Sequence, residues 1–312
     1  MVTKIRFGGY QGDNSVHTRG ARVFCDTLTR LAGDAVEVEF EQNIVASGHK
    51  ASDLLSMTES GELEGCYFSS SYLTARVPEL ALFDQHFMVP DRAQAYAVLD
   101  GSLGRRLTAE IAAKTGFCVL GYWDNGLRQI SSVDTAFRRP DDCKGLKLRT
   151  LASDDHQRVF SALGFEPVAI DVRDLPDAVA SGRVGAQENP LTNIYNFDLH
   201  KTHRVITMTK HLLGVALVLF NRKAVESWSS EVRSAVETAL AEATVAQRRF
   251  AEEDDETCAK ALIEEGVTLI ELSQQERATL ANASRAEVEK TRQRFGADLI
   301  ALFENDLAQV RT

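Results

Sequence analysis

The longest stretch of sequence without a helix-breaking residue lies in the last third of the chain. Residues 230 to 265 contain neither glycine nor proline, begin with a serine followed by Glu231, and are closed by Gly266. As one helix they would extend for about 54 Å, which is longer than the roughly 26 Å diameter of a 100-residue domain. We therefore expect one rod that crosses two domains. A break near the acidic run 252–256, giving two shorter helices, is the alternative.

The rest of the chain alternates between two hydrophobic periods. A period of two residues, typical of strands, and a helical period alternate along the sequence, and such alternation indicates an α/β fold with mostly parallel sheets. We expect strands at 4–7, 36–40, 66–68, 117–122, 146–150 and 267–272, and helices at 18–32, 51–60, 91–115 and 153–163, with two amphipathic helices at the end. A length of 312 residues fits two domains.

The composition excludes several classes of protein. There are 35 Lys and Arg against 45 Asp and Glu, a net charge of −10, so we expect no nucleic-acid partner. The longest apolar run, 212–220, is about half of the roughly 20 residues that a membrane-spanning helix needs. The five cysteines show no CxxC pair, and we expect small buried thiols rather than a metal site. The first residues show no leader-like pattern.

Common catalytic and cofactor motifs are absent. There is no GxSxG, no GxGxxG after a strand, no GxxxxGK[ST] and no HExxH, so we expect no cofactor and no enzyme activity. The residues that most resemble a catalytic cluster are Asp198, His200 and His203. Such a group can ligate zinc or transfer protons. A metal-dependent enzyme built on these three residues remains an alternative, although surface or capping histidines are the simpler interpretation.

Two arginines and an amide offer a different chemistry. Arg149 ends the predicted strand 146–150, and Arg128 follows another predicted strand after a turn. Ligands of open α/β sheets bind just outside the carboxyl ends of strands, where a guanidinium can match a carboxylate with two parallel hydrogen bonds. Asn189 precedes Pro190, which restricts it to an extended conformation and can hold its amide toward a ligand. Ordinary salt bridges and an ordinary turn are the alternatives.

These segments resemble a known family when taken in order. They are the run KGLKLR at 144–149, QENPLTNIY at 187–195, TKH at 209–211, PELALFD at 78–84 and WDNGLR at 123–128. Together they resemble the solute receptors of tripartite ATP-independent periplasmic (TRAP) transporters, the DctP family. Before QENP the family usually has Asp-Gly, where this chain has Gly185-Ala186. Val172 and Pro176 stand where the family often has an aromatic residue, which leaves the identity of the ligand open.

The resemblance implies an α/β fold of periplasmic-binding-protein type. It has two lobes with mixed sheets, hinge strands that cross between them and a long helix that spans both. We expect lobe I at 1–125 and 212–250, lobe II at 126–211 and 251–312, hinge strands near 125 and 212, and the long helix over 230–265. The lobes would close over one small organic acid.

The resemblance also implies roles for particular residues. Arg149 corresponds to the family's carboxylate-binding arginine, and Arg128 and Asn189 to its helpers. Asn14, Ser70, Tyr72 and Trp123 are expected to complete the ligand site, Trp123 as a flat apolar wall or as a core residue. The ligand would be a hydroxy acid, a dicarboxylate or a sugar acid. We expect a monomeric periplasmic receptor, its leader removed, that delivers the acid to TRAP membrane subunits. A binding module that feeds a sensor is the alternative.

Overall fold

The structure is a computed structural model that describes residues 2–89 and 91–310 and comprises two compact units. Unit 1 consists of Met1–Ser70, Thr108–Asn125 and Val215–Asp254, and unit 2 of Ser71–Leu107, Gly126–Gly214 and Asp255–Thr312. Three of the passages between units occur inside long elements, β4 (Phe117–Ser132), β8 (Val205–Asn221) and α9 (Ser230–Glu264). The segment 71–107, which the sequence analysis places in lobe I, belongs to unit 2. The lobe assignment is corrected at this segment.

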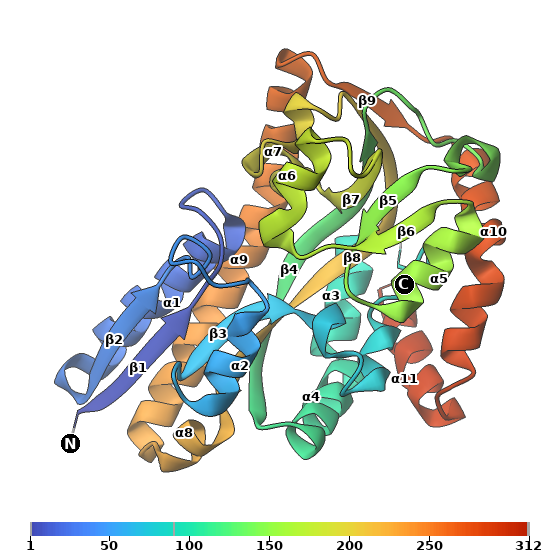
Figure 1. The fold of residues 1–312 in the computed structure, drawn as a ribbon. Coiled ribbons are helices and arrows are strands. Elements are labelled where there is room, and N and C mark those ends of the chain that lie inside the picture. Colours follow the sequence, from blue (N-terminus) through green and yellow to red (C-terminus); the bar gives the residue numbers. More distant parts are fainter. Residues whose placement is uncertain (1, 90, 311–312) are drawn as a thin grey trace. The chain divides into compact units, whose positions relative to one another are not determined.

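Unit 1 contains a small mixed sheet. Strand β1 (Thr3–Gly8) pairs in parallel with β2 (Val36–Glu41) and with β3 (Gly65–Ser69), and β3 pairs antiparallel with the last part of β8. In Figure 1, the arrows of β1 and β2 run in the same direction. The helices of this unit are α1 (Val16–Ala32), α2 (Asp53–Ser60), α8 (Arg222–Ser227), the end of α4 (Ser102–Lys114) and the first part of α9.

The core of unit 1 follows from the two-residue period of its strands. Ile5 and Phe7 are fully buried, whereas the alternating residues Lys4 and Arg6 are less buried. Phe7 packs against Phe24 of α1, with ring centroids 5.2 Å apart. Residues of α9 complete this cluster, namely Val232, Val236, Ala239, Leu240 and Ala243. The sheet is thus covered by helices on its apolar face, as the alternating pattern predicts.

Unit 2 contains the strands that carry the two arginines. Strand β5 (Lys147–Thr150) pairs in parallel with β6 (Glu166–Ala169) and with β7 (Ala186–Pro190), and β7 pairs antiparallel with the end of β4. Strand β9 (Thr268–Glu271) pairs in parallel with the start of β8. The helices wholly within unit 2 are α3 (Arg92–Asp100), α5 (Asp154–Leu163), α6 (Leu175–Ala180), α7 (Leu191–Asn196), α10 (Gln274–Arg292) and α11 (Ala297–Ala308).

The predicted fold class and the long helix are confirmed. The chain is α/β with mixed pairing, and α9 runs over 35 residues without a break, so the two-helix alternative is wrong. Phe250 of α9 carries the guanidinium of Arg19 over its ring at 4.2 Å, and Arg19 also pairs with Asp254 at 2.8 Å. Asp254, in the middle of the acidic run of α9, is thus paired within unit 1.

The predicted helix 91–115 is wrong as a single helix. The structure has α3 and α4 there, separated by Gly101 in an extended conformation. The Asp306 carboxylate accepts hydrogen bonds from the backbone N–H groups of Ser102 (3.1 Å) and Leu103 (2.8 Å). A side chain at Gly101 would approach the Ala97 carbonyl oxygen to 2.3 Å, which leaves no room for one. The start of α4 is therefore capped from a helix more than 200 residues away.

Replacement of Asp306 tests this cap. Asp306→Ala leaves two N–H groups of α4 without their acceptor, and we expect it to lower the free energy of unfolding by about 1–3 kcal/mol. Asp306→Asn, which keeps one acceptor oxygen, should lose less. Urea denaturation measures both, with Asp34→Ala at an exposed site as the control. Equal stability of Asp306→Ala and the parent would show that the cap contributes nothing.

Buried histidines make the stability of the fold depend on pH. Burial lowers the pKa of His17 in unit 1 and of His203 in unit 2, in each case to about 4. Burial also lowers the pKa of His86 and of His211 in unit 2. These groups bind protons more weakly in the folded protein than in the unfolded chain. The stability they contribute is present above the unfolded pKa and is lost as the pH falls toward the folded pKa.

We therefore expect the free energy of unfolding to fall between pH 7 and pH 5. Each histidine whose pKa is near 4 should remove roughly 2 kcal/mol over this range. Urea denaturation at several pH values measures the slope. His203→Asn should flatten the slope by the contribution of one histidine, whatever its effect at pH 7. An unchanged slope in this variant would contradict the assignment.

Candidate functional site

Arg149 is a buried cation with almost no protein partner. It lies in β5 and is 2% exposed. Its Nε donates a hydrogen bond to the Ile170 carbonyl oxygen at 2.9 Å, just after β6. Among the described residues, no acceptor lies within hydrogen-bond distance of Nη1 or Nη2 and no carboxylate pairs with the guanidinium. One edge of the guanidinium is thus anchored while the other remains available.

Arg128 is equally buried, but its Nε and Nη2 have protein partners. Its Nε and Nη2 donate to the two carboxylate oxygens of Glu188, with the Nη2–Oε1 distance 2.9 Å, and the two side chains are 1% and 0% exposed. Nη2 also donates to the Glu188 carbonyl oxygen at 2.7 Å. The register explains the contact, because Arg128 lies opposite Pro190 and Glu188 is two residues away on the same face. The sequence predicts a carboxylate-binding role for both arginines, whereas in the structure Arg128 is already paired with Glu188.

Glu188 is held in its ionised form. Burial alone would raise the pKa of this carboxyl, but the charge of Arg128 and hydrogen bonds from Arg128 and His211 outweigh burial and hold the pKa well below its usual range. His211 lies 3.5 Å from Glu188 and receives a contact from Thr209 at 2.7 Å. Burial lowers the pKa of His211, although the neighbouring Glu188 acts to raise it. The opposite charges of Arg128 and Glu188 compensate one another.

Asn189 belongs to a network of neutral groups. Its Oδ1 accepts from Arg128 and from Asn193, each at 3.3 Å, and its Nδ2 donates to Gln187 at 2.6 Å. Gln187 in turn donates to the Ser131 hydroxyl at 2.6 Å. The amide oxygen of Asn189 is thus committed to protein partners. One N–H of its amide has no acceptor among the described residues, so Asn189 can offer a ligand a donor.

Tyr72 lies within the electrostatic range of both arginines. Burial raises the pKa of this phenol, whereas the positive charges of Arg149 and Arg128 act to lower it and the negative charge of Asp171 raises it. All four of these residues belong to unit 2. The structure therefore brings together Tyr72, Arg128, Arg149 and Asn189, which the sequence analysis selected from segments far apart in the chain.

The other three predicted residues lie in unit 1. Asn14 is exposed in the loop before α1, and Ser70 is fully buried with a hydroxyl that has no hydrogen-bond partner. Trp123 is fully buried in the hydrophobic core, and its indole N–H donates to Thr244 at 3.1 Å. Of the two roles predicted for Trp123, its position in the structure fits the core residue.

Three polar residues near the arginines have no role in the sequence analysis. Glu188 lies within the QENP segment. Its pairing with Arg128 follows from the register of β4 and β7, which the sequence does not give. Thr150 follows Arg149 in the sequence and Ser153 comes at the start of α5, and both have buried hydroxyls without a hydrogen-bond partner. Ser153 occupies the N-cap position of α5 but does not use its side chain as a cap. A serine before a predicted helix indicates an N-cap. Only the structure shows that the hydroxyl of Ser153 makes no capping hydrogen bond.

The alternative metal site does not assemble. The Asp198 carboxylate pairs with Lys201 at 2.8 Å, His200 contacts Glu265 at 2.9 Å, and His203 contacts Ser131 at 3.0 Å. In the part of the chain that the structure describes, no group of three or more His, Cys, Asp or Glu residues is placed to hold a metal ion. Each of the three residues has a separate partner, so they do not form a common site.

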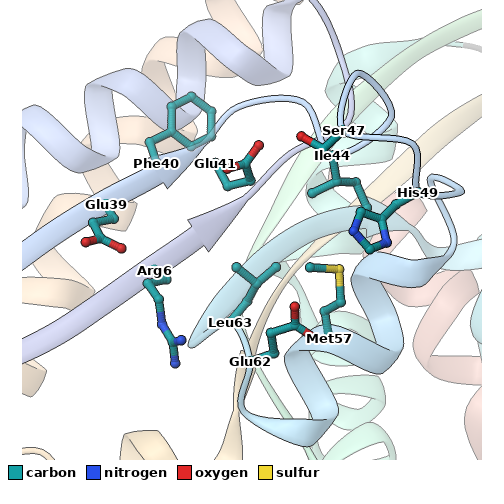
Figure 2. A pocket seen from close by; sticks show the side chains of 10 residues that line it. All are labelled: Arg6, Glu39, Phe40, Glu41, Ile44, Ser47, His49, Met57, Glu62 and Leu63. Atoms are coloured by element: carbon teal, nitrogen blue, oxygen red, sulfur yellow. The ribbon is translucent and has the colours of Figure 1, made fainter.

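A cavity of about 580 Å³ in unit 1 has the wrong charge for an anion. Figure 2 shows side chains from the neighbouring strands β1 and β2, among them Arg6 and Glu39, and Met57 from α2 around it. Arg6 is paired with Glu64 at 2.8 Å, and Glu39 is paired with Lys4 at 2.6 Å. The residues that line the cavity are Arg6, Glu39, Phe40, Glu41, Ile44, Ser47, His49, Met57, Glu62 and Leu63. The lining thus contains three glutamates and one arginine, and that arginine is already paired with Glu64. This excess of negative charge disfavours a carboxylate ligand in the cavity.

Comparisons with known proteins agree on one family. Residues 7–294 match the profile of "Bacterial extracellular solute-binding protein, family 7", also named DctP. The C4-dicarboxylate-binding periplasmic protein DctP of Rhodobacter capsulatus is 27% identical over 300 residues, which are 95% of this chain and 89% of that protein. No helix within residues 2–89 and 91–310 combines the length and hydropathy needed to cross a bilayer.

Two solved structures have the same fold over nearly their whole length. The sugar acid binding protein DctPAm from Advenella mimigardefordensis, in complex with galactonate, has a TM-score of 0.93 at 25% identity and covers 99% of each chain. A TRAP periplasmic solute-binding protein from Sulfurospirillum deleyianum with bound succinate has a TM-score of 0.90 at 27% identity, covering 97% of this chain and 99% of that chain. These relatives are binding proteins rather than enzymes. The chain thus belongs to bacterial extracellular solute-binding protein family 7, the DctP family of TRAP transporter receptors.

Proposed function

We propose that this chain is a periplasmic receptor that captures a small organic acid for a TRAP transporter, and that Arg149 binds the carboxylate of that acid. The observation that carries the proposal is the state of Arg149. Its guanidinium is 2% exposed, has one protein acceptor at Nε, and has no counterion among the described residues.

A buried charge without a partner is costly, and proteins pair such charges or bind a ligand that pairs them. The free Nη1 and Nη2 of Arg149 form a planar donor pair that matches the two oxygens of a carboxylate. Lysine would offer only a point charge at the same place. The geometry therefore favours a carboxylate over a neutral ligand.

The relatives support a carboxylate as the ligand class. One is a C4-dicarboxylate-binding protein, and the two structures hold galactonate and succinate. All of these ligands carry at least one carboxylate, although they differ in size and in number of charges. The shared feature is the group that Arg149 is placed to bind.

The remaining parts of the proposal follow from the family. The receptor would work in the periplasm, without a cofactor, and would deliver the acid to the TRAP membrane subunits. Tyr72 and Asn189 would supply uncharged donors beside Arg149. The contributions of Asn14 and Ser70, which belong to unit 1, and a monomeric state remain predictions.

A thermal-shift panel of organic acids tests the function directly. A ligand present at about 100 times its dissociation constant stabilises the folded protein by about 2.7 kcal/mol, so a true ligand should raise the melting temperature clearly. The neutral amide or ester of the same acid should not. A panel in which neutral analogues stabilise the protein as well as the acids would overturn the assignment.

Arg149→Ala should abolish tight binding of the acid found in that panel. Loss of the only partner of a buried carboxylate costs about 2–5 kcal/mol, which corresponds to roughly a 30- to several-thousand-fold weaker affinity. Arg149→Lys should lie between, because it keeps the charge without the planar fork. Calorimetric titration measures both, with the exposed Arg183→Ala in the same unit as control. Parent-like affinity of Arg149→Ala would contradict the proposed role.

The two buried arginines should also differ in their effect on stability without ligand. Arg128→Met leaves Glu188 as an unpaired buried charge, and we expect it to lower the free energy of unfolding by about 3–5 kcal/mol. Arg149→Met removes an uncompensated charge and one hydrogen bond, so it should cost no more than about 1 kcal/mol or should stabilise the ligand-free protein. Denaturant unfolding of the two variants measures the contrast. Similar large losses in both would show that Arg149 is paired within the protein.

A further inference from the structure

Three histidines of unit 2 form a continuous row in its interior, which we call the histidine row. The ring centroids of His86 and His156 are 4.8 Å apart, and those of His86 and His211 are 5.5 Å apart with planes inclined by 11°. All three residues are at most 2% exposed. Only His211 lies in a segment that resembles the family, so the row as a whole is not part of that resemblance.

A buried carboxylate lies at each end of the row. At one end, Oδ2 of Asp84 lies 3.1 Å from Nε2 of His156, a contact that becomes an ion pair only when the imidazole is protonated. At the other end, Glu188 lies 3.5 Å from His211 and is also paired with Arg128. Asp84 makes no side-chain hydrogen bond among the described residues. Its negative charge therefore has no cation beside it unless the row carries a proton.

The imidazoles respond to the charges around them. Burial lowers the pKa of His86 and of His211, and neighbouring imidazoles lower it further, whereas the charge of Glu188 acts to raise it. Each imidazole thus opposes a charge on the next, which favours one proton on the row over several. Nδ1 of His86 contacts the Asp84 carbonyl oxygen at 3.0 Å and must carry a hydrogen, so its unpartnered Nε2 is the nitrogen that can accept one.

A cavity of about 370 Å³ in unit 2 connects the row to solvent. His86 lines it together with the exposed residues Met88 and Arg285. The charged side chains that face the row or this cavity from other elements are Arg128 of β4 and Arg277, Arg285, Glu289 and Arg292 of α10. Their charges are present with and without a ligand, so they affect the proton affinity of the row in both states.

The row and Arg149 lie within reach of common charges. The charges of Arg149 and Glu188 both act on the phenol of Tyr72, and Glu188 lies 3.5 Å from His211. A carboxylate bound to Arg149 would therefore bring its negative charge into the surroundings of the row. Whatever other groups bind the ligand, a negative charge stabilises a proton near it, and salt screens buried charges only weakly.

We infer that the histidine row is a proton-binding site linked to ligand capture, so that binding of a carboxylate at Arg149 is accompanied by uptake of up to one solvent proton onto an imidazole nitrogen. The inference rests on the proposed function, because it assumes a carboxylate on Arg149. Linkage is reciprocal, so a protonated row binds the acid more tightly by the same factor. The affinity for the acid therefore rises as the pH falls.

Calorimetric titration of the unmodified protein measures the proton uptake. The probe is the tightest binder among galactonate, gluconate, lactate and succinate, titrated at pH 6.5 in MES and in Bis-Tris, which differ in heat of ionisation. We expect net uptake of protons, and binding at least about fivefold tighter at pH 5.5 than at pH 8, the lower end of the usual coupling between two sites. Binding without proton uptake overturns this inference and leaves the proposed function standing. Failure of all these acids and of the thermal-shift panel to bind overturns both.

Two substitutions test whether the proton resides on the row. His156→Gln keeps a nitrogen donor beside Asp84, and His86→Asn keeps a donor for the Asp84 carbonyl, but neither new side chain titrates. We expect each to reduce the proton uptake by at least about twofold. His200→Gln, which removes a buried histidine that contacts Glu265 instead, is the matched control and should leave the uptake unchanged. Uptake equal to the parent's in both row variants would place the proton elsewhere and refute the inference.

Nitrogen NMR of the unmodified protein, labelled at its histidines, measures the same proton if a row variant does not fold. The nitrogen shifts of an imidazole report its protonation state. Addition of the acid at pH 6.5 should move at least one ring toward the charged form, other than the rings of His17, His49, His200 and His203, whose signals are assigned by single substitutions. Row signals that do not move would rule out the linkage.

Discussion

A guanidinium that is buried without a counterion is the constraint around which the site is organised. Arg149 is held at Nε by the carbonyl of Ile170, so its orientation is fixed by β6 and the residue that follows it. The other edge of the guanidinium has no acceptor among the described residues. Such an arrangement is unfavourable in the ligand-free protein and becomes favourable only when an anion arrives. The strands β5 and β6 thus hold a cation that has no counterion among the described residues.

Arg128 shows that burial alone does not define a ligand-binding arginine. It has the same side chain, nearly the same burial and a neighbouring position in unit 2, but Glu188 occupies its guanidinium. The difference between the two arginines arises from the strand register of β4 and β7, which brings Glu188 within reach of one of them. Arg149 has no counterion among the described residues, whereas Arg128 is paired with Glu188 and also donates a hydrogen bond to the amide oxygen of Asn189.

Local patterns predicted much of this fold, and distant contacts explain what they missed. The strands β1, β2 and β5 and the unbroken helix α9 follow from short-range periodicity and from the absence of glycine and proline. The break at Gly101 depends on Asp306, and the compensation of the Arg128 charge depends on Glu188, 60 residues away. The burial of Trp123 depends on packing against α9. Arg149 could be predicted as a site residue because the end of a strand can be recognised from the sequence pattern. Its lack of a counterion is a property of the whole environment, and no pattern in the sequence expresses it.

An anchored but unpaired arginine also bears on how tightly a ligand can bind. A free arginine side chain loses rotational freedom when a ligand orders it, and that loss opposes binding by about 0.5–1.5 kcal/mol. The hydrogen bond to Ile170 and the burial of the stem have already ordered Arg149 in the ligand-free chain. The entropy cost of ordering the Arg149 side chain is therefore part of folding and does not oppose ligand binding. If Arg149 binds the carboxylate as we propose, the stability that its unpaired charge costs the ligand-free protein would contribute to the affinity for the ligand.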